Sequence, residues 1–133
     1  LNDGIIPGDP NTIPRFTWWN HQGTSEWVQY DLPSPITIAR SDILFFEDAS
    51  QGGGCDFPQT FSHEYWNGSA WAPMQLAHDY MNMIVLYGGH FTILRFSPVV
   101  TNKVRLKVTL KPGTFWSNVC VLTTMLPVMS LRW

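Results

Sequence analysis

The chain has 133 residues, a typical length for one domain with a hydrophobic core of its own. Charged residues make up 14% of it, against about 25% in an average soluble domain, and the formal net charge is -2. The composition lacks a basic stripe and therefore excludes nucleic-acid binding, which needs clustered lysines and arginines. No apolar run is long enough for a transmembrane segment. We expect a single domain over residues 1–133.

The first half of the chain has the pattern of β structure. "WVQYDL" (27–32) alternates apolar and polar residues, as a half-buried strand does. "ITIARSDILFFED" (36–48) is rich in β-branched and aromatic residues and is long enough for a strand that bends or carries a bulge. "TFSHEYWNGSAWAPM" (60–74) places Asn67-Gly68 between two strand-like runs, the strongest short signal for a β-hairpin.

The second half continues this pattern. "IVLYGGHFTILRFSPV" (84–99) is typical of further strands around a Gly-Gly pair. "KVRLKVTL" (103–110) alternates throughout, so its Val and Leu residues should face a core and its Lys, Arg and Thr residues water. Many short strands, loops rich in Pro and Gly, and no stretch of helical period predict an all-β fold, an antiparallel β-sandwich or jelly roll.

The two cysteines, Cys55 and Cys120, are too few for a disulfide-rich scaffold or a four-cysteine zinc site. Sequence alone does not show whether their side chains lie within bonding distance. We expect both thiols to be unpaired, with a disulfide as the alternative.

No motif of a catalytic site is present. The chain contains neither a G-x-S-x-G nucleophile elbow nor an H-E-x-x-H zinc motif, and its four histidines are scattered. Carboxylate pairs of the glycosidase kind would be available in any β protein with ten acids; the candidates are Glu26, Glu47, Asp48, Asp56 and Glu64. Binding needs only exposed rings and a few polar groups on a rigid scaffold. We therefore predict no catalytic residue and favour a binding function.

Five short motifs follow one another along the chain: Asp3-Gly4, Thr17 with Trp19, Trp27 to Leu32, Tyr65 with Gly68 and Trp71, and Phe96 to Leu106. In this order they resemble the discoidin, or coagulation factor 5/8 type C, superfamily. More narrowly they resemble family 32-like carbohydrate-binding modules appended to glycoside hydrolases. The resemblance covers residues 1–110 and implies an eight-stranded antiparallel jelly roll. Family members have a further stretch before the Asp-Gly, so the first strand is expected to be missing here. The tail from residue 113 departs from the family pattern.

The resemblance also implies one structural calcium ion, which many family members hold with the early Asp and a Glu in the closing strand. Asp3 matches the first of these positions, but no Glu follows Glu64 in this chain. Asp3 is therefore the one metal ligand that we name.

The function implied by the resemblance is that of a non-catalytic carbohydrate-binding module joined to a secreted glycoside hydrolase. Its partners would be a plant or microbial polysaccharide or oligosaccharide and the catalytic domain of the same parent chain. The alternative is a discoidin domain without sugar affinity, which acts as a structural spacer or binds protein or membrane. "YMNMIVLY" (80–87) is apolar enough for a membrane-binding loop tip, but it has no Lys or Arg nearby to attract anionic lipid.

The segment "FTWWNHQGTSEWVQYDL" (16–32) supplies the first sugar-binding candidates. Trp18 and Trp19 point to opposite sides if the segment is extended, so one should be buried and the other partly exposed. Both are candidates for ligand contact. His21 could donate to a sugar hydroxyl, or it is a loop histidine bonded to a local carbonyl. Glu26 matches a position where related modules place a polar ligand contact, or it is a solvated acid that begins a strand.

The loop "EDASQGGGCDFP" (47–58) supplies a second set of candidates. Related modules use a basic and an amide residue there to grip a pair of hydroxyls, and this chain has neither in place. Asp48 and Asp56 could chelate vicinal hydroxyls instead, so the usual sugar preference of the family does not carry over.

Three further tryptophans and one histidine come from other segments. Trp66 should face outward before the Asn-Gly turn and could stack on a ligand or on another domain, whereas Trp71 should belong to the core. His63, on the inward side of the same segment, should be a hydrogen-bonded core histidine. Trp116 lies in a loop that can add a ring beside the sugar in related modules.

Overall fold

The computed structural model describes residues 16–18, 21, 23–77 and 91–112, together with the backbone of residues 118–127. This part contains one 3-10 turn, Ala49–Gln51, and seven strands: β1 (Phe16–Thr17), β2 (Ser25–Phe46), β3 (Cys55–Asp56), β4 (Thr60–Trp66), β5 (Trp71–Pro73), β6 (Phe91–Thr109) and β7 (Asn118–Pro127). The prediction of an all-β fold is confirmed. The expectation of a missing first strand concerns residues 1–15, which lie outside the described residues.

Hydrogen bonds join the strands in the order β1-β7-β2-β6-β4-β5, and β3 pairs with β7 away from this path. All pairs along the path are antiparallel, and the short β3–β7 pair is parallel. The predicted antiparallel architecture is therefore confirmed for the main sheet.

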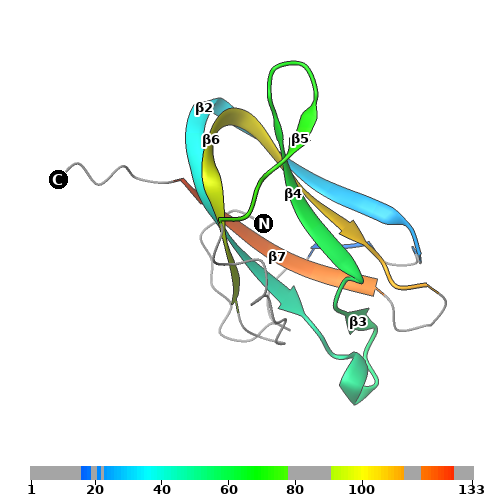
Figure 1. Ribbon diagram of the computed structural model, residues 1–133. Coiled ribbons are helices and arrows are strands. Elements are labelled where there is room, and N and C mark those ends of the chain that lie inside the picture. Colours follow the sequence, from blue (N-terminus) through cyan, green and yellow to red (C-terminus); the bar gives the residue numbers. More distant parts are fainter. Residues whose placement is uncertain (1–15, 19–20, 22, 78–90, 113–117, 128–133) are drawn as a thin grey trace.

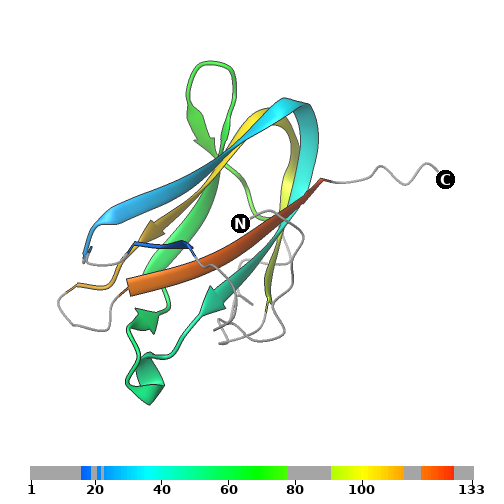
Figure 2. The same ribbon diagram turned by 180° about the vertical axis from the view of Figure 1, so that it is seen from behind.

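The sheet becomes a sandwich because its two longest strands bend. β2 and β6 arch over together at one end of the molecule, so that their two halves lie in different layers (Figure 1). Their register shifts between Asp31 and Ile36, a stretch that contains Pro33 and Pro35, which cannot donate to the ladder. One layer holds the start of β2, the end of β6, β4 and β5. The other holds the end of β2, the start of β6, and β7 (Figure 2).

The core lies between the two layers. The four apolar residues of the segment 103–110 are completely buried, as their alternation predicts: Val104, Leu106, Val108 and Leu110. They share one cluster with Ile43 and Phe45 from the end of β2. Burying a side chain of this size contributes about 1.5–3 kcal/mol before chain entropy is subtracted. The alternate residues of the same strands are thereby turned to the outside of the sandwich.

Several predicted strands merge in the structure. Most of the segments 27–32 and 36–48 belongs to the single strand β2, and β6 likewise joins the described part of 84–99 to most of 103–110. The predicted hairpin between β4 and β5 is confirmed. Its turn is closed by the N–H of Asn67 donating to the carbonyl of Ala70 at 3.1 Å. Gly68 takes a φ of 103° there, which L side chains rarely adopt.

Cys55 is disulfide-bonded, so the expectation of unpaired thiols is wrong. The other cysteine of the sequence, Cys120, belongs to β7. The parallel pairing of β3 with β7 places Cys55 opposite Asn118. This pairing joins segments that are far apart in the chain, which explains why no local sequence pattern revealed it.

Candidate functional site

One layer of the sandwich presents a continuous polar and aromatic surface to solvent. Its side chains alternate with the core residues of β2, β4 and β6, and we call them, together with Trp71 of β5, the outer face. The members are Ser25, Trp27, Gln29 and Asp31 of β2, Thr60, Ser62, Glu64 and Trp66 of β4, Lys103, Arg105, Lys107 and Thr109 of β6, and Trp71.

Strand register arranges the outer face in rows across β2, β6 and β4. One row holds Trp27, Lys107 and Ser62, and the next holds Gln29, Arg105 and Glu64. Residues directly opposite each other on antiparallel strands have Cβ atoms about 4.5–5.5 Å apart. In each row the side chain on β6 is therefore within contact range of its neighbours on β2 and on β4.

Arg105 lies at the centre of the outer face. Its guanidinium is 4.4 Å from the ring centroid of Trp71 and 5.9 Å from that of Trp27. Its Nε donates to Oε2 of Glu64, and Trp66 meets Trp71 edge-on with 5.7 Å between centroids. Cation–π contacts contribute about 0.5–1 kcal/mol at exposed sites and more where the cation is desolvated. The arginine thus holds two indoles from different strands on one surface.

Trp27 is the most open indole of the outer face, with 52% of its surface exposed. It is absent from the candidates chosen from sequence, although a signal was available. In "WVQYDL" the inward positions are Val28 and Tyr30, and their neighbour Trp27 must therefore point outward. The expectation that Trp71 belongs to the core is wrong, because its ring covers Arg105 on the outer face.

Trp18 is the buried member of the predicted Trp18–Trp19 pair. It is 7% exposed, belongs to the core cluster, and packs edge-on against Phe16 with 5.0 Å between ring centroids. The expectation that Trp18 stacks on a ligand is therefore not supported by its burial. Trp19 lies outside the described residues.

His21 and Glu26, predicted separately, are brought together by the structure. His21 Nδ1 lies 2.7 Å from Glu26 Oε1, and the same oxygen accepts a hydrogen bond from Thr24 Oγ1 at 2.8 Å. The hydrogen bond from Thr24 is the largest cause that lowers the pKa of Glu26, and His21 lowers it further. This small exposed cluster orders the approach to β2.

The carboxylates of the loop 47–58, which we call the acidic loop, bind groups of the protein itself. Asp48 Oδ1 accepts from the backbone N–H of Cys55 at 2.8 Å, and Asp48 O accepts from the N–H of Gly53 at 2.8 Å. A Cβ atom on Gly53 would clash with the Asp48 carboxylate, so a larger residue there would force this side chain to move. Asp56 accepts from the N–H of Phe57 and from Lys111 Nζ, both at 2.7 Å. Each aspartate is thus already engaged by groups of the protein itself.

Of the remaining candidates, Trp66 has the outward position that the sequence predicts and is half-buried against Trp71. Trp116 and Asp3 lie outside the described residues. Within the described part of the chain, no three His, Cys, Asp or Glu side chains gather into a group that could hold a metal ion. The calcium ion implied by the resemblance stays a prediction, because its named ligand, Asp3, is not among the described residues.

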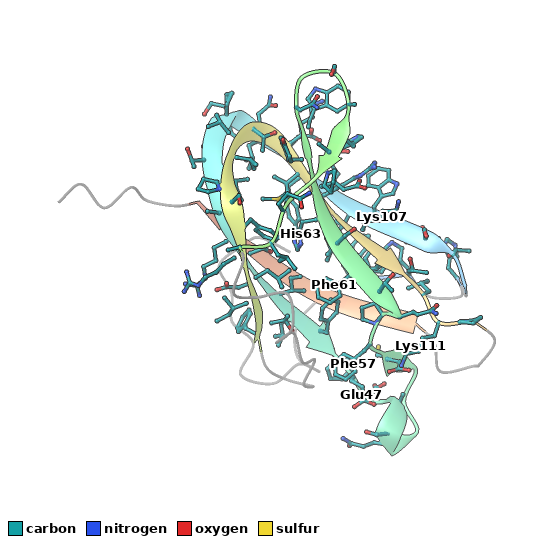
Figure 3. All side chains as sticks on the ribbon, viewed as in Figure 1. Glu47, Phe57, Phe61, His63, Lys107 and Lys111 are labelled. Carbon is teal, nitrogen blue, oxygen red and sulfur yellow. The ribbon has the colours of Figure 1, made fainter. Side chains whose placement is uncertain are left out.

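A cavity of about 110 Å³ is lined by Phe61, Ser62, His63, Met74, Leu76, Leu94 and Phe96. Two of these residues, Phe61 and His63, are labelled on β4 in Figure 3. The cavity is small and mostly apolar beside the roughly 300–1,000 Å³ of ordinary ligand pockets, and so it does not suit a sugar. His63 is the predicted core histidine. Its Nε2 lies 3.0 Å from Ser41 Oγ, and Nδ1 has no partner among the described residues. Burial lowers the pKa of His63 to about 3.

The fold and the outer face define an all-β sandwich module with an exposed aromatic platform on one of its layers. A solved chain of similar fold comes from a study of the multiple functions of the architecturally intricate β-galactosidase BgaA of Streptococcus pneumoniae. It superposes with a TM-score of 0.70 and 16% sequence identity, over 94% of this chain and 82% of that chain. At this identity the likeness is one of fold.

The chain matches no protein-family model and no curated protein sequence. Among the described residues there is no helix with the length and hydrophobicity to cross a membrane.

Proposed function

We propose that the chain is a non-catalytic carbohydrate-binding module of the discoidin type, which holds an appended secreted glycoside hydrolase on its polysaccharide. The surface that carries this proposal is the outer face, and above all the open indole of Trp27 beside the Arg105–Trp71 stack. This differs from the loop site that the sequence suggested.

The chemistry of the outer face suits a sugar ring. A pyranose offers C–H groups to an indole face and hydroxyls to polar neighbours. Trp27 has Gln29 beside it on the same face of β2 and Lys107 opposite it on β6, and Ser62 on β4 lies beyond Lys107 in the same row. The strands are fixed by their backbone ladders, so the platform is rigid before the ligand arrives. Preorganisation of this kind reduces the conformational entropy lost on binding.

The carboxylates on the outer face favour binding over catalysis. Asp31 lies 3.7 Å from Lys103 Nζ, and Glu64 is paired with Arg105. Both carboxylates are thus engaged by cations of the same surface, whereas a glycosidase needs two carboxyl groups that flank the scissile bond. The likeness in fold to a chain from a β-galactosidase study is compatible with an accessory role beside a hydrolase.

The benefit of such a module would be proximity. A weak site that keeps an enzyme on its polymer raises the effective concentration of substrate. For one shallow platform we expect a Kd of about 0.1–1 mM, equivalent to about 4–5.5 kcal/mol.

The test is affinity electrophoresis and tryptophan fluorescence with a panel of soluble plant and microbial polysaccharides. Trp27→Ala should weaken binding by roughly tenfold, because it removes the open stacking surface. Val100→Ala is the matched control, since Val100 is 68% exposed but is not part of the outer face, and it should bind as the wild type does.

Two outcomes would overturn the proposal in different ways. Absence of binding to every glycan would remove the carbohydrate function. Loss of binding in His21→Ala with full binding in Trp27→Ala would return the site to the loop before β2.

A further inference from the structure

The charges on the outer face are unevenly matched. Of its three cations, Lys103 has Asp31 within 3.7 Å and Arg105 is bonded to Glu64. Lys107, between them and the end of β6, has no carboxylate partner within the part of the chain that the structure describes. Three cations against two carboxylates leave one net positive charge on this surface, although the whole chain carries a formal charge of -2.

Lys107 faces outward, next to the most open indole of the outer face. Leu106 and Val108 on either side are completely buried, which turns Lys107 outward. Its direct neighbours across the sheet are Trp27 on β2 and Ser62 on β4. The unpaired ammonium group thus belongs to the same row as the most open indole, within reach of a ligand seated on that indole.

We propose that the outer face binds acidic polysaccharides, with a sugar ring on Trp27 and its carboxylate or sulfate group against Lys107. This inference rests on the proposed carbohydrate-binding function and deepens it by naming the class of glycan. The indole supplies stacking that any pyranose could use, the hydroxyl of Ser62 supplies a hydrogen bond, and the ammonium group of Lys107 selects the anionic substituent. A neutral sugar would leave the ammonium group facing water without gain.

The experiment compares polymers that differ only in charge. Polygalacturonate is paired with its carboxyl-reduced form, and a sulfated galactan with its desulfated form, so the two arms distinguish carboxylate from sulfate. The wild-type chain should bind the charged member of at least one pair about two- to fivefold more tightly, the range expected for one exposed ion pair. This preference should fall as NaCl is raised from about 20 to 500 mM, because screening weakens exposed pairs.

Lys107→Gln should abolish the preference while retaining binding to the neutral polymers. Lys111→Gln is the matched control, because it removes the same charge from a lysine that pairs with Asp56 in the acidic loop, away from Lys107 (Figure 3). It should keep the preference.

Three other outcomes would overturn the inference or a part of it. Equal binding of charged and neutral polymers by the wild type would overturn this inference and leave the carbohydrate function standing. A preference that survives in Lys107→Gln would overturn the assignment to Lys107. Absence of binding to all four polymers, and to the neutral panel as well, would overturn the proposed function and this inference with it.

Discussion

The outer face and the acidic loop contain similar residue types but use them in opposite ways. In the acidic loop, Glu47 accepts from the N–H of Ser50, and Asp48 accepts from the N–H of Cys55. On the outer face, the backbone groups of β2, β6 and β4 are paired with one another in the ladders. The loop must use side chains to replace the ladder hydrogen bonds that it lacks, whereas the strands need not. Side chains that are free to meet a ligand therefore remain on the strands, at Trp27 and Lys107.

The largest effect on stability and binding is expected from Arg105→Ala, at the centre of the outer face. The substitution removes two cation–π contacts and leaves the Glu64 carboxylate, 18% exposed, without its partner. We expect the free energy of unfolding to fall by about 2 kcal/mol, between the values typical of exposed and buried pairs, measured by urea denaturation. Glycan binding should weaken in the same variant. If the variant kept both the wild-type stability and the wild-type glycan binding, the Arg105–Trp71 stack would contribute to neither.

The second largest effect is expected from lowering the pH. It tests His63, which lies on the inner side of β4, behind the outer face. The pKa of His63 is about 3 in the folded state and 6.5 ordinarily, so the unfolded chain takes up the proton first as the pH falls. The stability that His63 contributes is complete above pH 6.5 and is lost as the pH falls towards 3. At about pH 5.5 the loss should be about 1.4 kcal/mol relative to neutral pH.

Urea denaturation over this pH range measures the loss, and His63→Gln is the control. The variant will be less stable at every pH, but its stability should change much less between pH 6.5 and 5.5. An equal slope in both proteins would assign the pH dependence to other groups. Glycan binding by the folded fraction should not change in this range, because His63 does not contact the outer face.

Asp48→Ala tests the acidic loop and is expected to have the third largest effect. It removes the hydrogen bond to the N–H of Cys55, and we expect a loss of about 1 kcal/mol in the free energy of unfolding. Binding to the preferred polysaccharide should remain at the wild-type level. If Asp48→Ala kept its stability but lost binding, the acidic loop and not the outer face would be the binding region.

The smallest effect is expected from Thr24→Ala beside the approach to β2. Without the hydroxyl, the pKa of Glu26 should rise towards its ordinary value, because the hydrogen bond from Thr24 is the main cause of its depression. A carbon-detected NMR titration of the Glu26 carboxyl measures this shift. Global stability and glycan binding should stay within experimental error of the wild type. An unchanged pKa would mean that His21 controls Glu26.

Period-two alternation predicted most of the strands and the core residues of β6, because a strand that is buried on one face alternates apolar and polar residues. The same alternation turns Trp27 outward, but the sequence predictions favoured loops as the usual binding elements and did not include this residue. Trp71 was misplaced for a different reason. Its environment depends on Arg105 from another strand, and no local pattern encodes that contact.

The acidic loop shows the other limit of sequence reasoning. Asp48 and Asp56 have the chemistry to chelate hydroxyls, and only the folded loop reveals that Cys55, Phe57 and Lys111 already bind them. The bulge predicted within 36–48 matches the register shift between Ile38 and Arg40, but the bend between Asp31 and Ile36 that unites two predicted strands in β2 was not predicted. The parallel pairing of β3 with β7 was not foreseen, because it joins distant segments.

The strand order has a consequence for how this protein is made. β7 follows the other described strands in sequence, yet it takes a place between β1 and β2. At a synthesis rate of about 5–20 residues per second, the end of β2 leaves the ribosome several seconds before its partner does. During that interval it presents an open row of N–H and C=O groups, on which a second nascent chain could pair. Closure of the sandwich therefore waits for residues 118–127, and ribosomes spaced closely on one message would expose neighbouring copies to each other in the unclosed state.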